Sequence, residues 1–100
     1  MNLIISTVMQ EKQRISFMIE KYEKTMSGLP RGSISERHVG GKTYYYLKYR
    51  DGKKVISKYI SSDNVEKLRE DIEKRKHTEA MLSSLKKEKE LADKFLGGVL

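Results

Sequence analysis

The chain has 100 residues, of which 37 % are hydrophobic and 35 % charged, so it can bury only a small core. It has no cysteine, which excludes a disulfide scaffold and zinc sites built from thiolates. The net charge is +7, and residues 31–60 hold eight basic and two acidic residues, a net of +6. Such focused charge is typical of a surface that binds a polyanion, and its sign excludes an acidic mimic of DNA.

The first predicted element is a helix within residues 1–28. Apolar residues recur at alternating steps of three and four, which places them on one helix face. Lys12 interrupts this stripe, and Phe17 widens it. Gly28 and Pro30 predict the end of the helix, because glycine favours the position after a helix and proline cannot continue one. The stripe consists of Ile5, Val8, Ile15, Ile19, Tyr22 and Met26.

The same segment bears on localisation. Its apolar start, from Met1 to Met9, lacks a basic n-region and is broken by Ser6 and Thr7, which argues against a signal peptide. No apolar run approaches the roughly 18–20 residues of a membrane span. We therefore expect a soluble, cytoplasmic protein that does not contact membranes.

Residues 31–60 predict a basic, three-stranded antiparallel meander. Gly40-Gly41 can take the positive φ angles of a tight hairpin turn, and Asp51-Gly52 is a strong two-residue hairpin signal. The expected strands are Ile34–Val39, Lys42–Arg50 and Lys54–Ile60.

A long helix is predicted over residues 63–96. Asp63 with Glu66 resembles a capping box, and Gly97-Gly98 is expected to end the helix. The expected fold is therefore α+β, a single domain over residues 1–100 whose two helices pair antiparallel. Because the second helix is longer than the first, part of its apolar stripe is expected to remain unmatched and to bind a protein partner or a second copy. The candidate contact residues are Leu82, Leu85, Leu91 and Phe95.

Alternation along the second strand separates its side chains into two sets. The set with Leu47 (Thr43, Tyr45 and Tyr49) is the better candidate to pack on the helices. The other set places tyrosines among cations, which can bind phosphates and stack on bases. The facing of the third strand stays open, because Ile56 and Ile60 alternate together with Lys54 and Lys58. The candidate nucleic-acid-binding residues are Arg31, Arg37, Lys42, Tyr44, Tyr46, Lys48, Arg50, Lys54 and Lys58.

The same residues have a purely structural interpretation. Tyrosines favour strands and can cover a small core, while cations on an exposed face can keep it soluble and protect its edges. No catalytic constellation accompanies them: His38 and His77 lie on different predicted elements with no carboxylate at ligand spacing. We expect no metal, no cofactor and no enzymatic activity.

A run of short motifs resembles the signature of a poorly characterised family of small bacterial, archaeal and phage-borne proteins. The resemblance covers roughly residues 20–80, with a helix before the meander and a charged helix after it. The motifs are Leu29-Pro30-Arg31-Gly32-Ser33-Ile34, Gly41-Lys42, Tyr44-Tyr45-Tyr46-Leu47, Tyr49-Arg50, Gly52-Lys53-Lys54 and Lys58-Tyr59-Ile60.

The meander is also similar to the arm-type DNA-binding domains of tyrosine integrases, which lay a three-stranded sheet in the major groove. The shared features are a Gly-Ser-Ile start, an aromatic middle strand, an Asp-Gly-Lys turn and a following helix. The chain departs from that pattern in its preceding helix, in the length of its last helix and in lacking a catalytic integrase domain. The resemblance implies that Arg37, Tyr44, Tyr46, Lys48 and Lys58 face DNA.

Two functional hypotheses follow. The first is a non-enzymatic protein that binds nucleic acid, DNA rather than RNA, through the basic meander and dimerises or docks through the long helix. The alternative is a protein-interaction module, such as a phage-borne or antitoxin-like regulator, that binds a larger protein or nucleoprotein complex.

Overall fold

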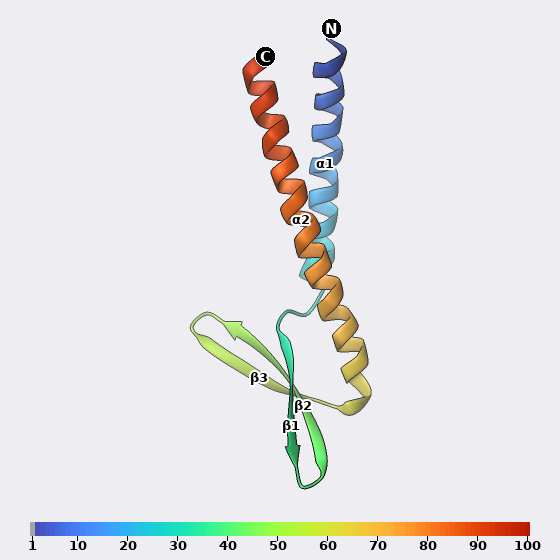
Figure 1. Ribbon diagram of the computed structural model, residues 1–100, viewed down its shortest axis with the longest axis vertical. Coiled ribbons are helices and arrows are strands. Elements are labelled where there is room, and N and C mark those ends of the chain that lie inside the picture. The colour runs from blue at the N-terminus through green and yellow to red at the C-terminus, as the bar shows by residue number, and fades with distance from the viewer. Residues whose placement is uncertain (1) are drawn as a thin grey trace. The chain divides into compact units, whose positions relative to one another are not determined.

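The computed structural model describes residues 2–100 (Figure 1). It has the predicted α+β class, with a helix, a three-stranded antiparallel sheet and a long second helix. The second helix runs through Gly97 and Gly98, which the sequence predicted would end it. The elements are α1 (Leu3–Ser27), β1 (Ser33–Val39), β2 (Lys42–Asp51), β3 (Lys54–Ile60), a short 3-10 turn (Ser62–Asn64) and α2 (Val65–Val99).

The residues divide into two compact units, which are described separately. The helical unit contains α1 and the part of α2 from His77 onward. The sheet unit, Leu29–Lys76, contains the three strands and the first turns of α2. The expectation of one domain over residues 1–100 stays a prediction.

Helix α1 begins with a side-chain cap and partly buries the predicted stripe. The Asn2 Oδ1 accepts hydrogen bonds from the backbone N–H groups of Ile4, at 2.8 Å, and Ile5, at 3.3 Å. Ile15, at the middle of the stripe, is buried. Phe17 does not widen the stripe as predicted, because 68 % of it is exposed. Two residues turn a helix by about 200°, so Phe17 lies on nearly the opposite side from Ile15.

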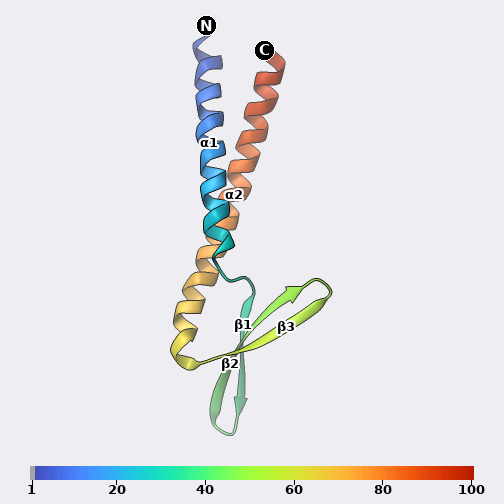
Figure 2. The same cartoon turned by 180° about the vertical axis from the view of Figure 1, so that it is seen from behind.

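Within the helical unit, α1 and α2 lie side by side and antiparallel, and both views show this (Figures 1 and 2). Two ion pairs define the direction: Lys12 Nζ lies 2.6 Å from Asp93 Oδ1, and Lys86 Nζ lies 3.3 Å from Glu23 Oε1. The early part of one helix thus meets the late part of the other. The buried residues that α2 contributes to this unit are Thr78, Leu82, Leu85 and Leu96.

The sheet has the order β1-β2-β3, with both pairs antiparallel. Gly40 and Gly41 have φ angles of 57° and 78°, as the predicted hairpin requires. The second turn is displaced by one residue from the prediction. Asp51 pairs with Lys54 inside the strands, so the turn residues are Gly52 and Lys53. Gly52 alone takes a positive φ, 64°, which matches a turn with glycine at its first central position.

The segment that leads into β1 is held by two close contacts. Gly32 has a φ of 119°, and a Cβ built on it would lie 2.3 Å from the backbone oxygen of Lys48. Only glycine allows this approach of the chain to β2. Arg75 Nη1 donates a hydrogen bond of 2.7 Å to the backbone oxygen of Leu29, which attaches the same segment to α2.

The face of the sheet that carries Leu47 is the one that packs on α2, as predicted. Ile60, Val65 and Ile72 are buried in this unit. Glu36, which shares that face, accepts a hydrogen bond of 3.4 Å from Arg69 of α2. Ile34, the cross-strand partner of Leu47, lines a small hollow together with Arg69 and Ile72. Over residues 2–100, neither helix combines the length and the apolar character needed to cross a membrane.

Candidate nucleic-acid interface

The strand register shows which side chains share the face opposite α2, here called the basic face. Residues paired across antiparallel strands project to the same side, so each β2 residue brings its partners with it. The face holds four cations and three tyrosines, and none of its residues is acidic. It consists of Ser33, Ser35, Arg37 and Val39 from β1, Lys42, Tyr44, Tyr46, Lys48 and Arg50 from β2, and Val55, Ser57 and Tyr59 from β3.

Both acidic residues of the strands project from the other side of the sheet. Glu36 is paired with Tyr45, and Asp51 with Lys54, which belong to the set that includes Leu47. Glu36 also forms an ion pair with Arg69 of α2 on that side. The sheet therefore separates its charges: the basic face is purely cationic, and the helix-packed face is mixed.

The register also decides the facing of the third strand. Lys58 is paired with Leu47, so Lys54 and Lys58 project from the helix-packed face and are not on the basic face. Arg31 is on that side too, since its guanidinium lies 5.8 Å from the centre of the Tyr49 ring. The Lys58 ammonium lies 5.6 Å from the same ring. Three of the nine candidates therefore lie on the helix-packed side: Arg31, Lys54 and Lys58. The other six lie on the basic face: Arg37, Lys42, Tyr44, Tyr46, Lys48 and Arg50.

Tyr59 is the tyrosine of the basic face that the candidate set omits. It is paired with Tyr46, and the two rings meet edge to face, with centroids 5.9 Å apart. The guanidinium of Arg37 lies 5.9 Å from the centre of the Tyr46 ring. Tyr44 and Tyr46 are half-buried, whereas 63 % of Tyr59 is exposed. The signal that could have found Tyr59 is alternation with Ile60, which requires Tyr59 to face away from the core.

A hollow of about 270 Å³ lies among residues of this face, and Glu36 of the helix-packed face also contributes to its lining. Short serine side chains leave the space, and longer basic and aromatic side chains surround it. The residues that line it are Ser35, Glu36, Arg37, Tyr46, Lys48 and Ser57.

The four candidate partner-binding residues of α2 have two different environments. Leu82 and Leu85 are buried within the helical unit, which corrects the prediction that they belong to an unmatched stripe. Leu91 and Phe95 are 67 % and 39 % exposed. The correction has a simple cause: the additional length of α2 is in its first turns, which belong to the sheet unit, and its later turns pair with α1.

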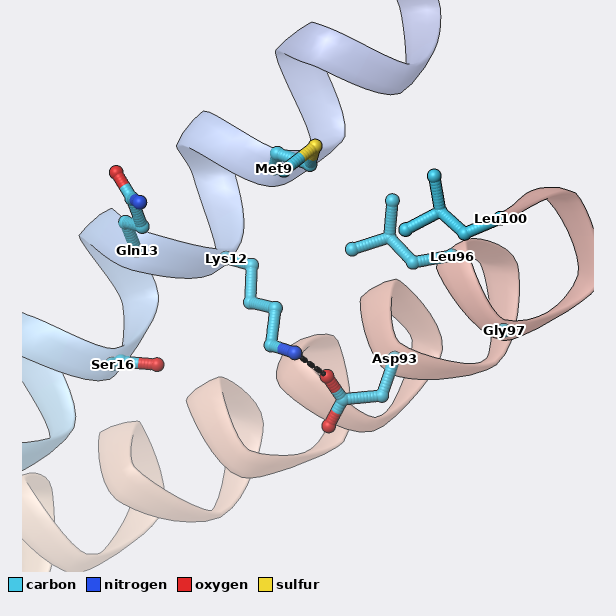
Figure 3. A pocket seen from close by; sticks show the side chains of 8 residues that line it. All are labelled: Met9, Lys12, Gln13, Ser16, Asp93, Leu96, Gly97 and Leu100. Carbon is cyan, nitrogen blue, oxygen red and sulfur yellow. Dashed lines mark ion pairs between the residues drawn. The ribbon is translucent and has the colours of Figure 1, made fainter.

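The helical unit has a groove of its own, between α1 and the end of α2 (Figure 3). Its volume is about 710 Å³, and Met9, Leu96 and Leu100 form the apolar part of its wall. The Lys12–Asp93 ion pair crosses it, as the dashed line in the figure shows.

One ion pair on α1 shifts the pKa of its carboxyl group. Among residues 2–100, no three His, Asp or Glu side chains are placed to hold a metal ion. Arg14 donates hydrogen bonds to the Glu11 carboxylate and holds the pKa of that group below its ordinary value. Both residues lie on the exposed surface of α1, so this shift describes a surface ion pair and not a reactive site.

One family model, a domain of unknown function called DUF6788, matches residues 9–70. The chain belongs to this family. The match covers most of α1, the whole sheet and the first turns of α2, and it agrees with the predicted membership of a poorly characterised family. No curated protein and no solved structure matches the chain. The similarity to arm-type integrase domains stays a prediction.

Proposed function

We propose that this DUF6788 protein is a non-enzymatic nucleic-acid-binding protein that binds DNA through the basic face of its sheet. The observation that carries the proposal is the separation of charge across the sheet. Four cations and three tyrosines share one face, and both acidic residues of the strands project from the other. The proposal needs no metal or cofactor, and it places the protein in the cytoplasm, where nucleic acid is accessible.

The physical basis is electrostatic. Arg37, Lys42, Lys48 and Arg50 are all exposed. Cations that contact phosphates release condensed counterions, and the logarithm of the affinity falls with the logarithm of the salt concentration by about 0.9 for each phosphate neutralised. Four such contacts correspond to a slope of about −3.6 on B-form DNA.

The shape of the element favours DNA over RNA. A small antiparallel sheet fits the major groove of B-form DNA, which is about 12 Å wide, whereas the major groove of A-form RNA is too narrow for side chains to read. The predicted resemblance to arm-type integrase domains supports the same docking. Four of the five residues that it implies, Arg37, Tyr44, Tyr46 and Lys48, share the basic face, and Lys58 does not.

The test is an anisotropy titration of a labelled DNA duplex at 50 and 200 mM salt, with two charge-matched double variants. Arg37→Glu with Lys48→Glu reverses two charges on the basic face. Lys54→Glu with Lys58→Glu reverses two charges on the opposite face of the same sheet. The first variant is expected to lose binding at both salt concentrations, and the second to bind with a several-fold loss from its lower net charge.

Two outcomes contradict the proposal: no binding of the wild-type chain at low salt, or equal losses in the two variants. Circular dichroism on both variants checks that the sheet is intact. A matched RNA duplex, titrated in parallel, tests the preference for DNA.

The second candidate function is a protein-interaction module, of the phage-borne or antitoxin-like kind. The observation that favours it is the exposure of Leu91 and Phe95, which lie four residues apart and therefore on one side of α2. Light scattering on the purified chain, and co-purification from its host, test it. A stoichiometric partner or second copy that is lost on Leu91→Ser and retained in the Arg37→Glu, Lys48→Glu variant supports this function. A monomer with no partner contradicts it.

A further inference from the structure

The hollow in the middle of the basic face combines two cations with two hydroxyl groups. Lys48 occupies the centre of one cross-strand row, with Ser33 on one side and Ser57 on the other. The adjacent row is Ser35, Tyr46 and Tyr59. The short serine side chains make a depression beside the long Lys48 and Arg37 side chains, and the hollow measures about 270 Å³.

We propose that this hollow is a phosphate seat, in which Ser35, Arg37, Lys48 and Ser57 hold one backbone phosphate of the bound nucleic acid. This inference rests on the proposed function and adds the contact that fixes the position of the strand. The Lys48 ammonium and the Arg37 guanidinium supply charge, and the guanidinium can donate two parallel hydrogen bonds to two phosphate oxygens. The serine hydroxyls donate to the remaining oxygens.

The neighbouring aromatic ring defines one wall of the seat. Tyr46 is contacted by the Arg37 guanidinium and by the Tyr59 ring, with 5.9 Å between centres in each case. These contacts position Arg37 beside the hollow. Glu36 also lines the hollow, but its carboxylate accepts a hydrogen bond from Arg69 on the helix-packed side, which offsets its repulsion of an anion.

The chemistry of the lining favours a phosphate over a base. Two cations and two serine hydroxyl groups surround the space, which suits a cluster of anionic oxygens. The Tyr46 ring is the aromatic part of the lining, and it is already contacted by the Arg37 guanidinium and the Tyr59 ring. Phosphate contacts set register and orientation on the duplex without reading its sequence. The seat therefore anchors the sheet, and any sequence preference must come from other residues of the face.

The experiment separates hydroxyl from charge contributions. Ser35→Ala with Ser57→Ala removes both hydroxyls of the seat and no charge. It is expected to weaken duplex binding roughly tenfold, because a hydrogen bond to a charged group is stronger than one between neutral groups, and to leave the salt slope unchanged. Lys48→Gln is expected to reduce the slope by about one. Ser33→Ala is the matched control: it lies on the same face and in the same row as Lys48, but outside the lining of the hollow.

A second measurement uses inorganic phosphate as the probe, followed by amide NMR spectra of the full chain. Saturable shifts at Ser35 and Ser57 that disappear in the double serine variant support the seat. If the duplex binds the wild type, and the double serine variant binds as tightly as Ser33→Ala, the seat is wrong and the proposed function stands. If no duplex binds, the proposed function is wrong, and the phosphate titration alone then decides whether the hollow takes an anion.

Discussion

Tyr46 and Tyr59 are cross-strand partners on β2 and β3, and their rings meet edge to face with an interplanar angle of 70°. Edge-to-face contact places the positive rim of one ring against the negative face of the other. The pair lies on the side of the sheet that does not pack against α2. It gives the basic face an aromatic centre beside the Arg37 and Lys48 side chains.

Removing one ring of this pair is expected to destabilise the sheet moderately. Tyr59→Ala should lower the free energy of unfolding by about 0.5–1.5 kcal/mol, the usual contribution of an aromatic cross-strand pair. Urea denaturation followed by circular dichroism measures it. Tyr59→Phe retains the ring and is the control, with little expected change. If Tyr59→Ala leaves the free energy of unfolding unchanged, the contact between the two rings does not contribute to stability.

Gly32 is expected to be the glycine least tolerant of substitution. Gly32→Ala must accept a positive φ and also displace the backbone of Lys48, so it should destabilise the protein by about 2 kcal/mol or more. The control is Gly98→Ala, since a Cβ on this helical glycine meets nothing within 4 Å and alanine favours a helix. Thermal denaturation of both variants compares them, and equal melting temperatures would show that the close approach at Gly32 is not needed.

Two leucines on α2 should respond very differently to the same substitution. Leu82 is 4 % exposed and Leu91 is 67 % exposed. Leu82→Ala should cost about 2–3 kcal/mol because it leaves a cavity between the helices, and Leu91→Ala should change stability by less than about 0.5 kcal/mol. Denaturant midpoints at low protein concentration measure both effects. A loss for Leu91→Ala that grows as the protein concentration is raised would mean that Leu91 is covered by a second copy.

The Glu11–Arg14 pair has a defined pH dependence. Its hydrogen bonds favour the carboxylate and lower the pKa of Glu11. The stabilisation is therefore fully present above the ordinary pKa of a glutamate and is lost as the pH falls through the lowered value. An NMR titration of the Glu11 side chain should show the lowered pKa, and Arg14→Gln should raise it toward the ordinary value. Lys24→Gln, which removes a cation elsewhere on α1, should leave the Glu11 pKa unchanged.

Local signals in the sequence predicted most of the fold correctly. The steps of three and four between apolar residues predicted α1, and Ile15 is buried at the middle of that stripe. The glycine pair at 40–41 predicted the first hairpin, because two successive positive φ angles are accessible to few other residues. The second turn lies one residue later than predicted, because Asp51 pairs with Lys54 inside the strands. Helix α2 ends three residues later than predicted, because it continues through Gly97 and Gly98 despite their low preference for a helix.

The sequence by itself determined that positive charge is concentrated in residues 31–60 and that β2 separates Leu47 from Tyr44 and Tyr46, because alternation along one strand is a local property. Only the tertiary structure decided which residues of β1 and β3 join each set. The register removed Lys58 from the basic face and added Tyr59, and the pairing of α1 with α2 buried Leu82. Register and helix pairing depend on contacts between residues distant in the chain, and such contacts are settled by the packing of the whole unit rather than by the pattern within any one segment.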